Sequence, residues 1–143
     1  MKKLVTLALV LFASVSLFAQ APQKVLDVFN SKYPGATEVK WGNKLTRYTA
    51  WFTFKGERLK ADFNDDGAWK DTEFEMSYDA LPQAIKDGFR KTQYADWKVE
   101  KGVRIEAEGR EPQYRLEVKT NVANQKNLFF NAKGEFIREA RTL

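Results

Sequence analysis

The sequence predicts an α+β protein in which a helix packed on an antiparallel four-stranded sheet occurs twice, after a cleaved leader. Three observations support this prediction: an internal repeat, strands with alternating apolar residues, and two short amphipathic helices. The 143 residues suffice for one compact domain with a real core. The chain contains no cysteine, so disulfides cannot contribute to its stability.

The N-terminus has the three parts of a secretory signal peptide. Met1-Lys2-Lys3 is positively charged, residues 4–18 are mostly apolar, and Ala19-Gln20-Ala21 has the small residues that a signal peptidase requires. We therefore predict a signal peptide over residues 1–19, cleaved after Ala19 or Ala21. The apolar run is short for a membrane span, and no cysteine follows it to carry a lipid. We expect a periplasmic or secreted protein of a Gram-negative bacterium, without a membrane anchor after cleavage.

Three groups of residues recur in the same order along the chain. The first group, Pro22 to Val25, matches Pro82 to Ile85 at an offset of 60. The other groups match at offsets of 66 and 67: Tyr48, Ala50 and Phe52 with Tyr114, Leu116 and Val118, and Phe63-Asn64, Gly67 and Trp69 with Phe130-Asn131, Gly134 and Phe136. Because the offset grows only where loops are expected, the pattern favours a duplication. We predict one helix-plus-sheet unit over residues 22–78 and a second over residues 79–143.

Each unit is predicted to begin with a helix. Val25, either Val28 or Phe29, and Tyr33 have the spacing of one buried helical stripe. Ile85 and Phe89 form a shorter stripe in the second unit, which Gly88 weakens. Both helices are short, so we expect each to require a sheet for its stability.

Apolar and polar residues alternate along the segments that follow each helix. Tyr48, Ala50 and Phe52 alternate with Thr49 and Trp51, and the second unit shows the same period. Such alternation indicates a sheet that packs on its helix with one face and meets water with the other.

Aromatic residues on the water-facing side are candidate contact residues. The alternation places Trp51 and Phe129 there, and Trp69 is a third candidate whose face is ambiguous. Exposed aromatic residues are typical of protein-binding surfaces, and Lys60 and Arg115 are expected around them as a polar rim. Alternatively, the rings fill a seam between the two units or pack beneath a loop.

One hairpin resembles a calcium-binding loop. Asp62, Asn64, Asp66 and Glu73 fit the spacing of EF-hand ligands around a glycine turn. However, an EF-hand needs flanking helices, and the matching segment 129–136 keeps the turn but loses the acids. We interpret the segment as a plain β-turn, with weak calcium binding as the alternative, and expect no cofactor.

Composition excludes several functions. Without histidine or cysteine, the chain lacks the residues for Ser-His or Cys-His catalysis and for thiolate zinc sites. After removal of the leader, 22 basic and 19 acidic residues remain, too small an excess for a nucleic-acid-binding face. The clustered acids lie on one hairpin, whereas a glycosidase needs two carboxylates across a cleft. We therefore predict a protein that is not an enzyme and does not bind nucleic acid.

The order of several short motifs resembles a known family. The residues are Tyr33-Pro34-Gly35-Ala36, Val39, Trp41 and Tyr48, then Phe63 to Trp69, and Leu81-Pro82. Together they resemble the PepSY-like, β-lactamase-inhibitor-protein-like (BLIP-like) family of small exported proteins, frequent in the Bacteroidetes. The resemblance spans about residues 22–141. The second unit is more divergent, with Gln93-Tyr94-Ala95-Asp96 where the first has its helix stop.

The resemblance implies tandem units, each with one helix on about four strands, and no established enzymatic activity. The β-lactamase inhibitor grips its enzyme with a concave outer sheet and loops, and PepSY domains are associated with restraining peptidases. This chain lacks the disulfides of that inhibitor. We predict a non-enzymatic periplasmic binding module that engages an unknown envelope protein through its exposed sheet face. The alternative is a small-ligand or weak calcium-binding protein that uses the sheet concavity or the Asp62–Glu73 turn.

Overall fold

The computed structural model describes residues 21–141, in which a helix and four strands are followed by a second helix and four more strands. The signal peptide predicted for residues 1–19 lies outside the described residues. The elements are α1 (Gln23–Lys32), β1 (Thr37–Lys44), β2 (Arg47–Phe54), β3 (Glu57–Asn64), β4 (Trp69–Met76), α2 (Gln83–Arg90), β5 (Lys98–Ala107), β6 (Gln113–Asn121), β7 (Asn124–Asn131) and β8 (Phe136–Arg141).

All these strands belong to one antiparallel sheet in the spatial order β1 to β8. Each strand pairs with the next along the chain, and β4 pairs with β5 even though α2 lies between them in sequence. The predicted α+β fold is therefore confirmed, but the strands form one continuous sheet instead of two separate ones. Pairing across this junction satisfies backbone groups that two separate sheets would leave on open edges.

Each helix begins after a proline and buries one stripe of side chains against the sheet. Pro22 and Pro82 occupy the N-cap positions, where their fixed φ is tolerated and no N–H is lost from the helix. Of the helices within residues 21–141, neither is long and apolar enough to cross a membrane. The buried helical residues are Val25 and Phe29 in α1, and Ile85 and Phe89 in α2, as the predicted stripes require.

Two clusters of buried side chains hold the helices on the sheet. The α1 cluster includes Phe52 and Phe63, and the α2 cluster includes Leu116 and Phe130. Phe63 and Phe130 are fully buried and lie at matching positions of the repeat. Burial of rings of this size supplies much of the hydrophobic stabilisation under each helix.

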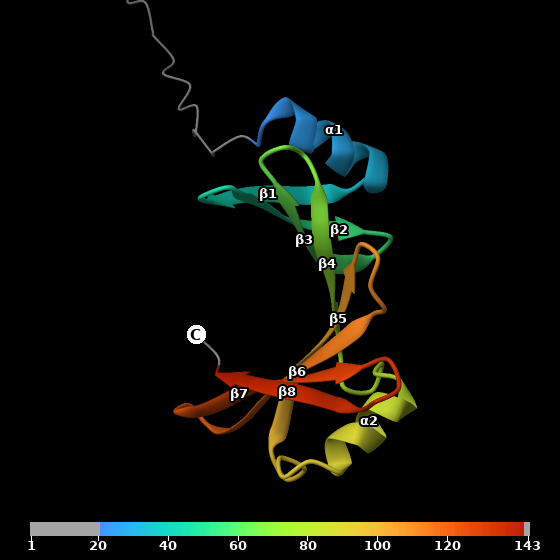
Figure 1. Cartoon of the computed structure of the whole chain (residues 1–143), viewed down its shortest axis with the longest axis vertical. Helices are drawn as coiled ribbons and strands as arrows, with labels where there is room; N and C mark the ends of the chain where they lie inside the picture. The colour runs from blue at the N-terminus through green and yellow to red at the C-terminus, as the bar shows by residue number, and fades with distance from the viewer. Residues whose placement is uncertain (1–20, 142–143) are drawn as a thin grey trace, which may run out of the picture.

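The sheet is bent, with α1 outside one arm of the bend and α2 outside the other (Figure 1). The strong twist of antiparallel sheets favours such coiling. The face opposite the helices is therefore concave, and we call it the concave face. Strand register places on it Thr49, Trp51, Lys60, Asp62, Asp71, Glu73, Val103, Arg115 and Phe129.

Candidate functional site

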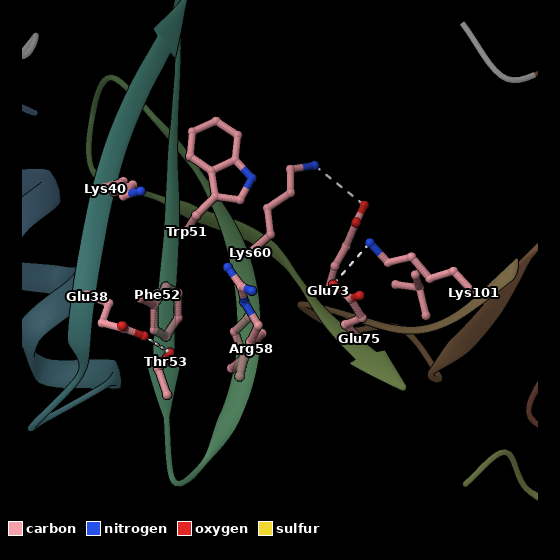
Figure 2. Close-up of a pocket in the computed structure, with 12 residues that line it drawn as sticks. Glu38, Lys40, Trp51, Phe52, Thr53, Arg58, Lys60, Glu73, Glu75 and Lys101 are labelled. Carbon is pink, nitrogen blue, oxygen red and sulfur yellow. Dashed lines mark hydrogen bonds and ion pairs between the residues drawn. The ribbon is translucent and has the colours of Figure 1, made fainter. Parts of the chain in front are cut away.

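A pocket of about 250 Å³ lies on the concave face, over strands β1 to β5. Figure 2 shows Trp51 standing on β2, with Lys60 beside it on β3 and Glu73 beyond Lys60 on β4. Other lining residues include Lys40, Arg58, Glu75 and Lys101. These side chains project from paired strands, which hold their relative positions more firmly than loops do.

Trp51 is supported by the backbone although its side chain is 46% exposed. The indole lies against Gly42 of β1, where a Cβ would come within 2.9 Å of the indole Cζ3. In the strand register, Trp51 lies opposite Lys40 on one side and Lys60 on the other. One side of the ring thus rests on β1 between two lysine side chains. A large aromatic residue held in this way loses little conformational freedom on binding a partner.

Glu73 is the centre of an ion-pair network that connects β3, β4 and β6. Its carboxylate oxygens accept hydrogen bonds from Arg115 Nη1 at 2.9 Å and Nη2 at 3.0 Å, and Lys60 Nζ lies 3.5 Å away. Burial by itself raises the pKa of Glu73, but the hydrogen bonds and charges of Arg115 and Lys60 bring it below its usual value. Glu73 is therefore ionised at neutral pH, and the bidentate pair joins the two halves of the sheet.

Two further carboxylates on this face lie in unequal surroundings. Asp62 is 4% exposed, accepts a hydrogen bond from Thr49 Oγ1, and has Arg47 Nη1 at 3.7 Å and Lys60 Nζ at 3.8 Å. Asp71 lies directly opposite Asp62. Burial and, next, the charge of Asp62 raise the pKa of Asp71. The ionised form of Asp71 is thus disfavoured in the folded protein.

The structure brings three of the predicted contact residues onto one surface and buries a fourth. Trp51, Lys60 and Arg115 all lie on the concave face, with Lys60 and Arg115 joined through Glu73. Phe129 projects from the same face, but it is only 9% exposed. The prediction that Phe129 is exposed is wrong, because Arg138 lies opposite it on β8 with its guanidinium carbon 3.6 Å from the ring centroid.

Trp69 lies on the other side of the sheet. An irregularity in the β3–β4 pairing places Trp69 opposite Phe63, and its ring packs on the α1 cluster. The indole N–H donates a hydrogen bond to Thr72 Oγ1 at 2.9 Å, and Lys32 Nζ lies 3.7 Å from the ring centroid. These contacts make Trp69 a packing residue beneath α1, so it does not contribute to the concave face.

The residues of the candidate calcium motif have other partners. Asn64 ends β3 and Asp66 lies in the β3–β4 turn, where Asp66 Oδ1 accepts a hydrogen bond from the Ala68 N–H at 2.9 Å. Asp62 and Glu73 are engaged by the basic side chains described above, and strands flank the segment on both sides. Within residues 21–141, no three acidic, histidine or cysteine side chains lie close enough to hold a metal ion.

Sequence reasoning missed several residues of the pocket. Lys40, Arg58 and Lys101 line it, and Glu73 joins a partner 42 residues away in sequence. The alternation of β3, extended by two positions from Lys60, would have placed Arg58 on the same face. The pairing of Glu73 depends on which strands are neighbours, and no local pattern carries that information.

These observations define a small α+β protein with one open, bent antiparallel sheet and a charged concave face around a tryptophan. The family described as "Putative beta-lactamase-inhibitor-like, PepSY-like" matches residues 46–138. The chain belongs to this PepSY-like family, which confirms the resemblance found in its sequence.

Solved structures from Bacteroides have similar folds. A DUF2874 family protein from Bacteroides ovatus is 26% identical, with 85% of this chain and 87% of that chain covered and a TM-score of 0.80. A BLIP-like protein from Bacteroides fragilis is also 26% identical, with 85% and 86% covered and a TM-score of 0.77. A structure from Bacteroides eggerthii, described as "putative periplasmic proteins", is 24% identical, with 85% and 88% covered and a TM-score of 0.78. Comparison with curated protein sequences finds no match.

Proposed function

We propose that this protein is a non-enzymatic, inhibitor-like binding module that is exported to the periplasm and engages a protein partner through its concave face. Membership of the PepSY-like family and the fold of the BLIP-like neighbour support a binding role. The description of the Bacteroides eggerthii neighbour supports the location. The observation that carries the proposal is Trp51, a large aromatic residue that is half exposed and rests on the Gly42 backbone.

A small-ligand function has less support than a protein-binding function. The pocket beside Trp51 has a volume of about 250 Å³. Sites for drug-sized ligands usually enclose roughly 300–1,000 Å³ and are mostly apolar. Charged side chains from several strands line this pocket, which suits a site within a larger protein interface.

We also propose that residues 22–78 and 79–143 are two copies of one ancestral unit. Support comes from equivalent contacts at the ends of the two helices. The Tyr33 hydroxyl is hydrogen-bonded to Thr72, and the Tyr94 hydroxyl is hydrogen-bonded to Glu139. Thr72 and Glu139 are separated by the same offset of 67 that relates the two glycine turns.

The test compares Trp51→Ala with Phe136→Ala, since Phe136 is similarly exposed (45%) but lies beside α2, away from the concave face. Both variants should retain a wild-type melting temperature. Crosslinking in periplasmic extract should join wild type and Phe136→Ala to the same partner, and Trp51→Ala should lose at least about 90% of that product. Equal crosslinking by both variants contradicts the proposal, as does unfolding of Trp51→Ala.

A further inference from the structure

Two cations of the pocket beside Trp51 have no ion-pair partner among the residues that the structure describes. Lys40 and Arg58 are both exposed and line this pocket, and within residues 21–141 neither forms an ion pair. Lys40 lies directly opposite Trp51 on β1, and Arg58 lies opposite Thr53, two residues along β2. Two positive charges that have no ion-pair partner within residues 21–141 therefore line the pocket beside the indole, and Glu38 is the acid of this pocket that also lacks an ion pair there.

The acids of the same pocket already have donors. Glu73 accepts two hydrogen bonds from Arg115, and Glu75 Oε2 lies 3.1 Å from Lys101 Nζ. Glu38 Oε2 accepts a hydrogen bond from Thr53 Oγ1 at 2.8 Å. An incoming cation would compete with these contacts, whereas an incoming carboxylate would meet Lys40 and Arg58 without breaking any of them.

We infer that this pocket receives an aspartate or glutamate side chain presented on a protruding loop of a folded protein partner. The inference rests on the proposed function and specifies its chemistry. The concave face suits a convex loop, and a volume of about 250 Å³ suits one or two side chains. Trp51 contacts the apolar part of the loop, while Lys40 and Arg58 bind its carboxylate.

A library of displayed, disulfide-closed random peptides tests this inference without knowledge of the natural partner. Peptides are selected on the immobilised wild-type protein and on the double variant Lys40→Glu/Arg58→Glu. The matched control is Lys24→Glu/Lys133→Glu, which makes the same charge change at two exposed residues on α1 and the β7–β8 turn. Peptides that bind the wild type but not Trp51→Ala are taken to bind the pocket, and we call them Trp51-dependent binders.

We expect Trp51-dependent binders selected on wild type and on the control to be enriched in Asp and Glu. Their affinity should fall at least about tenfold on the charge-reversed variant, and selection on that variant should favour Lys and Arg instead. Trp51-dependent binders that show no acidic preference, or that ignore the charge reversal, overturn the inference and leave the proposed function standing. Recovery of no Trp51-dependent binder overturns the proposed function as well. Succinate that displaces the peptides at micromolar concentration indicates a small-carboxylate site and also overturns the inference.

Discussion

The two halves of the sheet share one arrangement but differ at their last strand. β4 is an interior strand, paired with β5, whereas β8 is an edge of the sheet. At matching positions, Thr72 is fully buried and hydrogen-bonded to Tyr33, while Glu139 is exposed and contacts Tyr94 and Lys126. A charged side chain is tolerated on the edge strand because water solvates it there, but not at a buried position of an interior strand, where Tyr33 and Trp69 contact Thr72. Strand position thus decides which residue type a matching position accepts.

The helices also approach their glycine turns at different distances. A Cβ built on Gly67 would lie 3.1 Å from the Lys24 carbonyl oxygen, whereas a Cβ on Gly134 would lie 2.0 Å from that of Ala84. In α2, a Cβ on Gly88 would lie 1.9 Å from the Gly134 carbonyl oxygen. Gly88 therefore allows α2 to pack closer to its turn than α1 does. Glycine at position 88 is unfavourable for the helix itself, but it permits the close contact between α2 and the Gly134 turn.

Thr72→Glu should change the free energy of unfolding more than any other substitution considered below. It places the carboxylate of the second half at a position with no exposure to water, and we expect a loss of about 3–5 kcal/mol in the free energy of unfolding. The reciprocal change, Glu139→Thr, should cost much less because β8 is an edge. Urea denaturation of both variants measures the difference. Equal losses of stability would show that the edge position of β8 does not decide which residue type is accepted at positions 72 and 139.

Gly88→Ala should destabilise the protein by about 3 kcal/mol, the upper part of the range for overpacking. Alanine normally stabilises a helix interior relative to glycine by up to about 1 kcal/mol. The sign of the change in the free energy of unfolding therefore tests the close contact between α2 and Gly134. Ser31→Ala, at an exposed position of α1, is the control and should be neutral or slightly stabilising. A stabilised Gly88→Ala variant would mean that α2 does not approach Gly134 as closely as described.

Arg115→Met should cost about 2 kcal/mol at pH 7, because it leaves Glu73 partly buried without its bidentate donor. The pKa of Glu73 is lowered in the folded protein, so its stabilising contribution is present above its usual value of 4.5 and is lost as the pH falls through the lowered pKa. The difference between wild type and variant should therefore shrink in acid. Arg110→Met, at an exposed residue in the β5–β6 turn, should show neither effect. A constant difference from pH 7 to pH 3 would argue against the ion pair.

Asp71→Asn should have the smallest effect and the opposite sign. Burial and the neighbouring Asp62 raise the pKa of Asp71, so its ionised form opposes folding above that raised pKa. We expect a gain of up to about 1 kcal/mol at pH 7 that disappears below the usual value of 3.8, where the acid is protonated in both states. Thermal unfolding at pH 7 and pH 3 measures it, with exposed Asp65→Asn as control. Destabilisation at pH 7 would show that Asp71 has a favourable partner.

Local patterns predicted much of the fold and part of the site. The spacing of Val25 and Phe29 predicted the buried side of α1, and the alternation around Trp51 predicted its exposure. The same reasoning failed for Phe129, because Arg138 covers it from the adjacent strand. It left the side of Trp69 ambiguous, since an irregularity in the strand pairing changes the alternation there. Each of these residues was decided by a neighbour that is distant in sequence or by a break in regular pairing.

The sequence by itself determined the helices, the strands around residues 48–63 and 103–118, and the side of the sheet on which Trp51 lies, because these depend on residues within a few positions of one another. Tertiary structure alone decided that β4 pairs with β5, that Glu73 pairs with Arg115, and that Lys40 and Arg58 line the pocket beside the indole. These features depend on which strands become neighbours and how the sheet bends. That choice minimises the free energy of the whole chain, so no short segment encodes it.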